Sequence, residues 1–248
     1  MKKNIITSLL MTALLLATSI QLLKAQNGNP AVEKIESNPE GQGLLMTLKF
    51  EKGSAHNHPL MAVWLETEDG KFIETLFVAE SIGKGIFKHA DQSSGKWMEG
   101  AVDRPAALPY WGHQRGIKNS KGFYLPDQNN PEVDAVTGPT PKASFDLSFH
   151  LSNCPVGNCR ILVEINQSWD WNEHWTNQRS DDPDYRSSAQ PSVIYEAVVD
   201  PHILPDTILM KPIGRGDEAG KSGTLFSDLE TMTSALQIAK KITLVVGQ

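Results

Sequence analysis

The chain has 248 residues, 40% of them hydrophobic, and a formal net charge of −6 at pH 7. Its six tryptophans and its hydrophobic content exclude a disordered chain. The acidic balance excludes a nucleic-acid-binding protein, because no excess of basic side chains is present to neutralise phosphates. The length suits one large domain or two small ones.

Residues 1–25 have the three parts of a secretory signal. Two lysines precede an apolar run over residues 5–23, and Ala25 is a small residue at a suitable cleavage position. An uncleaved anchor is the alternative, since the run is long for a signal. Cleavage leaves residues 26–248 with a net charge of −9, and no apolar stretch in them approaches the roughly 20 residues of a membrane span. We therefore expect a periplasmic or secreted protein with no membrane span after signal cleavage.

Strand patterns dominate the mature chain. Apolar and polar side chains alternate most clearly over residues 145–151, which indicates one buried and one solvated face. Asp69-Gly70 lies between two strand patterns and predicts a hairpin, whereas residues 227–240 stay ambiguous and no window predicts a long amphipathic helix. Further strands are predicted over residues 44–50, 61–65, 72–78, 160–165, 192–199, 208–210 and 242–246.

Many short strands with this alternation predict an all-β fold. We expect an antiparallel β-sandwich, built as a single domain over residues 26–248, with a long, ordered, irregular insertion. Two interruptions of the strand pattern hold the candidate functional residues.

The first interruption is the insertion, residues 79–143, which holds eight glycines and six prolines. Its aromatic side chains supply apolar surface to bury, so we expect it to be ordered and to pack along the sandwich. Arg104 is a candidate partner for an anion or a carboxylate. A packed proline-aromatic loop without a ligand is the alternative. One rigid, aromatic segment of the insertion carries four candidate ligand-binding residues, Arg104, Tyr110, Trp111 and His113.

The second interruption is the Trp-rich loop, residues 166–191, which contains three tryptophans and no Leu, Ile, Val, Phe or Met. Aromatic and polar residues without aliphatic ones are typical of ligand-facing loops. If the strand that begins at residue 160 continues, Trp169, Trp171 and Trp175 share a face with the core and extend it. The alternative is an aromatic platform that binds sugar rings or another planar ligand.

The opposite face of such a continued strand carries Asp170, Asn172 and His174 at intervals of two. This ladder of oxygen and imidazole ligands suits a divalent cation such as Ca²⁺ or Mn²⁺, and a solvated strand face is the alternative. The carboxylates of Asp170 and Glu173 leave a glycan hydrolase as a weaker alternative. Because no catalytic motif occurs, we assign no catalytic residue.

Cys154 and Cys159 are the only cysteines, and they bracket a turn-forming Pro-Val-Gly-Asn tetrad between two predicted strands. A structural zinc site needs four ligands, so this pair predicts a disulfide that closes a hairpin loop in an oxidising compartment. Its stabilisation should be on the order of 2–3 kcal/mol or less, because the closed loop is short.

Two motifs carry a family resemblance. Residues 61–70 followed by Glu74-Thr75-Leu76 are similar to the opening hairpin of a bacterial periplasmic family, and residues 133–141 resemble that family's Asp-Ala-x-Thr-Gly-Ala-Thr signature. Over roughly residues 42–200, the chain resembles the uncharacterised domain-of-unknown-function family 2271. Pro139 departs from the signature, where Ala is usual, and the insertion is longer than expected for the family.

The resemblance implies a periplasmic Ig-like sandwich that serves a redox or metal-uptake system, since some members of the family are joined to or encoded near flavin transferases and iron-linked membrane reductases. We therefore expect an exported, non-catalytic binding or accessory protein. Its partner would be a small molecule, a glycan or a periplasmic protein, and not a nucleic acid. A divalent cation is the one cofactor that the pattern admits.

Overall fold

The computed structural model describes residues 32–91, 93–133, 136–151, 153–154, 157–203 and 205–246. The predicted signal, residues 1–25, lies outside the described residues. Glu33–Gln248 form one compact unit, to which all the strands named below belong. Among the described residues, none of the helices is both long and apolar enough to span a membrane.

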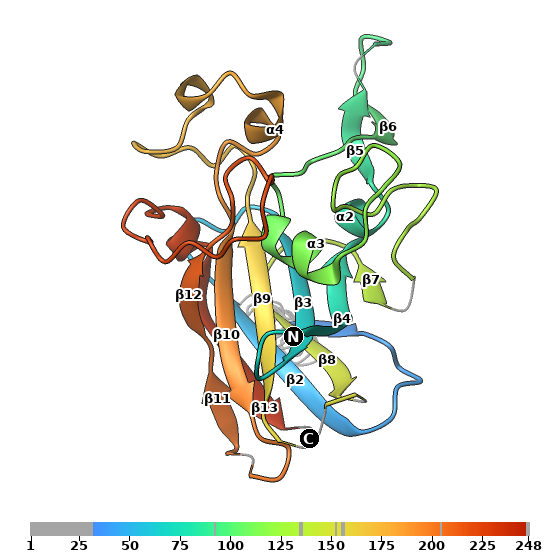
Figure 1. Ribbon diagram of the computed structural model, residues 1–248, viewed down its shortest axis with the longest axis vertical. Helices are drawn as coiled ribbons and strands as arrows, with labels where there is room; N and C mark the ends of the chain where they lie inside the picture. The colour runs from blue at the N-terminus through green and yellow to red at the C-terminus, as the bar shows by residue number, and fades with distance from the viewer. Residues whose placement is uncertain are drawn as a thin grey trace, which may run out of the picture. The chain divides into compact units, whose positions relative to one another are not determined.

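Two larger sheets stack on each other (Figure 1). The five-stranded sheet has the order β1 (Glu33–Glu36), β8 (Phe145–Leu151), β2 (Leu44–Lys52), β13 (Ala239–Val246) and β11 (Thr207–Leu209). The six-stranded sheet has the order β12 (Lys211–Arg215), β10 (Val193–Val199), β9 (Cys159–Asn166), β3 (Leu60–Thr67), β4 (Phe72–Ala79) and β7 (Thr137–Gly138).

The strand pairing confirms the prediction of an all-β sandwich. Most neighbouring strands pair antiparallel, as the alternation of the sequence predicts. The edge strands β1 and β7 instead run parallel to β8 and β4, so the sheets are mixed. Both edge strands are too short to show an alternation in the sequence, which is why they were not predicted.

The main core lies between the two sheets. On β8, the apolar side chains are buried and the polar ones between them reach the outer face, because successive strand residues point to opposite sides. On that outer face, the hydroxyls of Thr47 and Ser148 lie 3.2 Å apart across two strands. Inward side chains from both sheets form the core, among them Met46, Leu48, Phe145, Leu147, Phe149, Met61, Val63, Ile161 and Val163.

The six-stranded sheet is buried on its other face as well. The insertion supplies this cover, so β3 and β9 are buried at almost every position. Trp64, at the centre of the covered face, is fully buried. This second core joins Ala62, Trp64, Leu162 and Ile194 of the sheet to Phe87, Leu108 and Trp111 of the insertion.

The insertion contains more regular structure than expected. Its elements are α2 (Glu80–Gly83), the hairpin of β5 (Ile86–Asp91) and β6 (Met98–Ala101), α3 (Pro109–Arg115) and the edge strand β7. In Figure 1, α3 lies in front of the six-stranded sheet, and the hairpin projects past the end of that sheet. An ordered insertion packed along the sandwich is thus what the chain forms.

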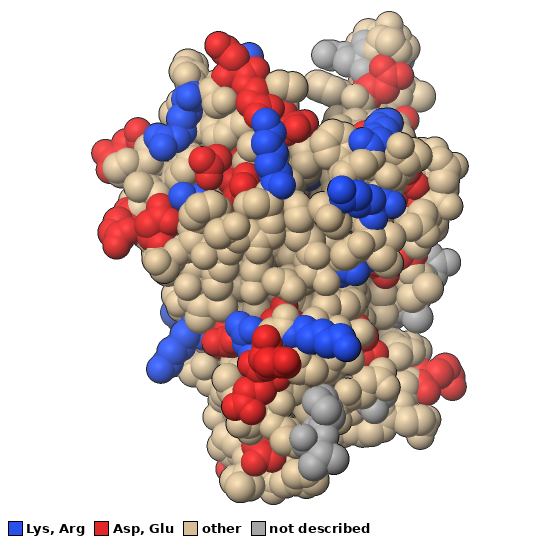
Figure 2. All heavy atoms as spheres, viewed as in Figure 1, with Lys and Arg blue, Asp and Glu red and all other residues tan. Residues whose placement is uncertain are grey.

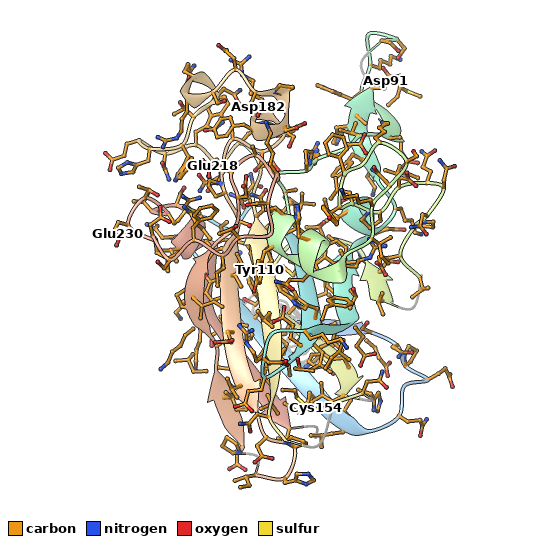
Figure 3. All side chains as sticks on the ribbon, viewed as in Figure 1. Asp91, Tyr110, Cys154, Asp182, Glu218 and Glu230 are labelled. Carbon is orange, nitrogen blue, oxygen red and sulfur yellow. A yellow bond between two sulfur atoms is a disulfide. The ribbon has the colours of Figure 1, made fainter. Side chains whose placement is uncertain are left out.

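The Trp-rich loop and the disulfide lie at opposite ends of β9. The predicted disulfide between Cys154 and Cys159 is present, with 6.1 Å between the two Cα atoms, and Cys159 is the first residue of β9. The Trp-rich loop leaves the other end of β9 and holds η2 (Asn177–Arg179) and α4 (Pro183–Arg186). Figure 3 shows this separation through its labels for Cys154 and Asp182.

Two local predictions are also resolved. Gly70 adopts a φ of +84° in the tight connection from β3 to β4, where the Thr67 backbone N–H donates to the Lys71 carbonyl at 2.9 Å, so Asp69-Gly70 forms the predicted hairpin. The ambiguous residues 227–240 form turns and the short helix η3 (Ala235–Gln237), followed by the start of β13.

Candidate functional site

The Trp-rich loop leaves the sheet as soon as it begins. Strand β9 ends at Asn166, so the continued strand on which the alternation of residues 169–175 depended does not form. Buried polar groups close the base of the loop instead. The Asn166 side-chain amide donates to the Gln190 carbonyl at 2.6 Å, and the Ser188 hydroxyl donates to the Asn166 side-chain oxygen at 3.0 Å.

Trp175 belongs to the main core and is 2% exposed. Its indole N–H donates to the Thr231 hydroxyl at 3.1 Å, which ties the loop to the C-terminal segment. Guanidinium groups lie over its ring, that of Arg179 at 4.4 Å and that of Arg215 at 5.2 Å from the ring centroid. The structure thus places Trp175 in the core, the first of the two positions that the sequence analysis gave for it, and not on an exposed aromatic platform.

Trp169 and Trp171 have the opposite environment, because they are 46% and 50% exposed. Trp169 has a φ of +64°, a left-handed conformation that is unusual for a bulky residue. Its backbone N–H donates to the Ser188 carbonyl at 2.7 Å, and its indole N–H donates to the Arg186 carbonyl at 3.0 Å. An exposed aromatic ring is thus fixed in one orientation.

Arg104 of the insertion lies between two aromatic rings. Its guanidinium carbon is 4.0 Å from the ring centroid of Phe87, on β5, and 4.6 Å from that of Trp169. We call Phe87, Arg104 and Trp169 the aromatic slot. The slot joins the insertion to the Trp-rich loop, and Figure 2 shows a notch between the β5–β6 hairpin and that loop.

The Arg104 guanidinium keeps its charge and its donors. Burial lowers its pKa to about 10, which leaves it cationic at neutral pH. Within the part of the chain that the structure describes, it has no ion pair and no side-chain hydrogen bond, and stacking on the two rings is its main contact. Its five N–H donors are therefore available to a ligand.

The backbone that carries Arg104 is held on two sides. The Ala106 N–H donates to the Ser187 hydroxyl of the Trp-rich loop at 3.3 Å. On the other side, Gly220 of the C-terminal segment packs so tightly that a Cβ atom there would lie 2.1 Å from the Pro105 carbonyl oxygen. Three distant segments therefore place this one side chain.

The other candidates from the insertion have packing roles. Trp111 is fully buried, and its indole N–H donates to the Thr75 hydroxyl at 3.2 Å. Tyr110 is buried with its ring 5.9 Å from that of Trp64, and this burial raises its pKa. His113 is half-buried, and its ring lies 4.2 Å from that of Tyr124. The structure thus places Tyr110 and Trp111 between the insertion and the sheet, whereas His113 packs on Tyr124 within the insertion (Figure 3 labels Tyr110).

Glu164 is an important residue that the sequence analysis did not single out. It lies on the covered face of β9, is fully buried, and accepts hydrogen bonds from the backbone N–H groups of Tyr110 at 3.2 Å and Trp111 at 2.7 Å, and from the Ser192 hydroxyl. Burial raises its pKa to about 7. The sequence did contain a signal for this residue, because Glu164 is a carboxylate inside the otherwise apolar strand pattern of residues 161–165.

The predicted cation ligands do not form a ladder. The Asn172 side-chain oxygen accepts from the backbone N–H groups of His174 and Trp175, both at 2.8 Å, so it is already engaged. His174 instead lies against Glu173, 3.2 Å from its carboxylate. In the described ranges, no three His, Cys, Asp or Glu side chains cluster as a metal site. Asp170 keeps one buried carboxylate oxygen without a hydrogen-bond partner among the described residues.

The comparisons with known proteins add no assignment. No family model matches the chain, and neither a curated protein nor a solved structure matches it. The resemblance to family 2271 therefore stays a prediction.

Proposed function

We propose that this chain is an exported, non-catalytic binding protein whose ligand site is the aromatic slot together with Trp171. The observation that supports this proposal most directly concerns Arg104. Its guanidinium lies over the rings of Phe87 and the exposed Trp169, and its N–H donors have no hydrogen-bond partner among the described residues. Sites that bind ligands combine aromatic surface with a few fixed polar groups, and this slot has both.

The conformation of Trp169 supports the proposal. A bulky residue at a φ of +64° is strained by about 1–3 kcal/mol, yet its ring remains 46% exposed. Burial of the ring would offset the strain, and packing against this chain leaves much of that surface uncovered. Strained residues cluster at binding sites because the surrounding structure holds them ready for a ligand.

Export and the accessory role rest on separate observations. The disulfide is compatible with an oxidising compartment such as the periplasm. The signal pattern of residues 1–25 and the resemblance to family 2271 point the same way. We therefore extend the proposal to an accessory protein of a periplasmic redox or metal-uptake system.

The test is a fragment screen followed by NMR on ¹⁵N-labelled protein. The library holds neutral, cationic and anionic fragments, and the indole N–H signals are assigned with single Trp→Phe variants. We expect fragments to shift the signals of Trp169 and Trp171. Trp97, which is 57% exposed on the connection between β5 and β6, is the matched control. If no fragment shifts Trp169 or Trp171 more than Trp97, the proposed binding function is contradicted.

One observation favours a second candidate function, divalent cation binding by the Trp-rich loop. Buried side-chain oxygens of Asp170, Asn177 and Gln190 have no hydrogen-bond partner among the described residues, and oxygen ligands suit Ca²⁺ or Mn²⁺. Thermal unfolding with and without each cation tests it, with D170N as the variant that should remove any rise in Tm. A Tm that does not change on addition of Ca²⁺, Mn²⁺ or Zn²⁺ contradicts cation binding.

The glycan hydrolase alternative gains no support. The Glu173 side chain is 79% exposed and contacts His174, whereas Asp170 has a buried carboxylate oxygen. A glycosidase needs two carboxyls that face each other across a cleft. These two residues share no such environment.

A further inference from the structure

We infer that the aromatic slot binds a carboxylate, held by the Arg104 guanidinium, whose adjoining ring packs on Trp169. This inference rests on the proposed function and names the ligand class of the same site. A guanidinium presents a planar fork of N–H donors, and a carboxylate matches this fork with two parallel hydrogen bonds.

The free donors of Arg104 point to an anion. A partly buried cation without a partner is unfavourable, and proteins normally pair it with an acid. The acidic neighbour in sequence, Asp103, is engaged elsewhere. It accepts from the Lys121 ammonium at 2.6 Å and from the Asn119 side-chain amide at 3.0 Å. Because this chain supplies no acid to Arg104 within the described residues, a ligand is the remaining source.

The charge around the slot favours a monoanion. The other cations of the Trp-rich loop and its neighbours have contacts of their own. Arg186 pairs with Asp181, Lys221 pairs with Asp182, and Arg179 lies over Trp175. The slot therefore offers one uncompensated positive charge in an acidic protein. A carboxylate needs one such charge, whereas a phosphate dianion needs more cations or a set of backbone N–H donors.

The rings of the slot favour a carboxylate that carries a ring. Both Phe87 and Trp169 contact the guanidinium, with ring centroids 4.0 and 4.6 Å from its carbon, so the charge has its place in the slot before a ligand arrives. Trp169 is 46% exposed where it contacts this guanidinium, and its backbone N–H and its indole N–H are both hydrogen-bonded. A ligand ring attached to the carboxylate can stack there, because stacking on a rigid tryptophan loses little conformational freedom.

The experiment is a titration of the ¹⁵N-labelled protein with matched probes. Benzoate is compared with benzamide, and glucuronate with glucose, so that each pair differs mainly in the carboxylate. Acetate tests the carboxylate without a ring, and inorganic phosphate tests the other anion class. We expect the ring-bearing carboxylates to shift the Arg104 Nε–H and Trp169 indole signals and to bind about tenfold or more tightly than their neutral partners.

The variants separate charge from fork geometry. R104Q should weaken carboxylate binding by about tenfold or more, and R104K, which keeps the charge but not the planar fork, should restore only part of it. R179Q is the matched control, since Arg179 also lies over a tryptophan of this loop but outside the slot. We expect R179Q to bind like the native protein. Thermal unfolding of each variant confirms that it is folded.

Three results would overturn the inference. They are equal binding of benzoate and benzamide, carboxylate binding that R104Q leaves unchanged, and tighter binding of phosphate than of every carboxylate. If neutral fragments shift Trp169 and no carboxylate does, the carboxylate inference fails while the binding function stands. If no compound shifts Trp169 or Trp171, both fail.

Discussion

At the scale of single residues, two tryptophans of the Trp-rich loop differ in exposure, and their indole N–H groups donate to different partners. Trp175 donates to Thr231 from inside the core, whereas Trp169 donates to a carbonyl of its own loop and stays 46% exposed. Side-chain type therefore did not decide which tryptophan is exposed. The contacts that each ring makes beyond the end of β9 did.

The first prediction concerns the stability of Trp→Ala variants. W175A removes a fully packed ring and should lower the free energy of unfolding by about 3–5 kcal/mol. W169A removes a half-exposed ring and its contact with the Arg104 guanidinium, so the free energy of unfolding should fall by about 1 kcal/mol. W171A should lower the free energy of unfolding by no more than that. Urea denaturation monitored by circular dichroism measures all three. A collapse of the W169A fold comparable to that of W175A would contradict the assignment of Trp169 to a ligand surface.

The second prediction concerns Glu164 and pH. Burial raises its pKa to about 7 from an ordinary value of 4.5, so the folded chain binds this proton more tightly than the unfolded chain. Stability from this group is fully present below about pH 4.5 and is lost as the pH rises through 7. The unfolding free energy should therefore fall over this window.

The variant E164Q tests this assignment because it cannot titrate. We expect its unfolding free energy to lose most of the pH slope between pH 5 and 7.5, whereas E40Q, at an exposed loop position, keeps the native slope. Identical slopes in E164Q and the native protein would show that another group causes the pH dependence.

At the scale of elements, α3 depends on the sheet beneath it. A helix of seven residues is not stable alone. It forms here because Glu164 accepts two N–H groups from its first turn and Trp111 packs on the six-stranded sheet. Pro109 at its first position needs no hydrogen bond, and Gly116 ends it at a φ of +75°. The insertion is thus ordered by contacts that its own sequence does not contain.

The third prediction tests how closely α3 is packed. A Cβ atom on Gly112 would lie 2.2 Å from the Tyr124 carbonyl oxygen. G112A should therefore lower the unfolding free energy by about 1–3 kcal/mol, although alanine favours a helix over glycine by about 1 kcal/mol. Chemical denaturation measures the change. G100A is the control, because Gly100 has no positive φ and the nearest atom to a Cβ there, the Ala90 Cβ, lies at 3.4 Å. A stabilised G112A would contradict the packing.

At the scale of the whole unit Glu33–Gln248, the two sheets have different surroundings. The five-stranded sheet has a polar outer face, and the six-stranded sheet is covered by the insertion. The ends of β9 also differ, since one carries the disulfide and the other leads into the Trp-rich loop. We therefore expect the disulfide to stabilise the fold without shaping the slot.

The fourth prediction follows from that separation. The double variant C154S/C159S should lower the unfolding free energy by on the order of 2–3 kcal/mol or less, because the closed loop is short. The indole N–H signals of Trp169 and Trp171 should keep their positions in ¹⁵N spectra, since the disulfide lies at the other end of the sheet. Shifts at Trp169 as large as those near residue 159 would show that the two ends are coupled.

The positions of the longer, alternating strands followed from the sequence because alternation is a local property. Residues 145–151 alternate along one strand, and one buried face explains the pattern without any knowledge of the partner strand. The pairing of Cys154 with Cys159 was equally local, since five positions separate the two residues. The sequence also indicated that Arg104 and the Trp-rich loop hold candidate ligand residues.

Only the tertiary structure decided which candidates meet. Arg104 contacts Phe87 and Trp169 because the insertion folds over the six-stranded sheet and the Trp-rich loop turns back at its end. The strand that would have alternated over residues 169–175 does not form, because β9 ends at Asn166. Buried amide hydrogen bonds replace strand pairing there. Contacts between segments far apart in the chain leave no periodic signal. The sequence alone therefore determined the alternating strands and the disulfide, whereas long-range packing determined the short edge strands and the slot.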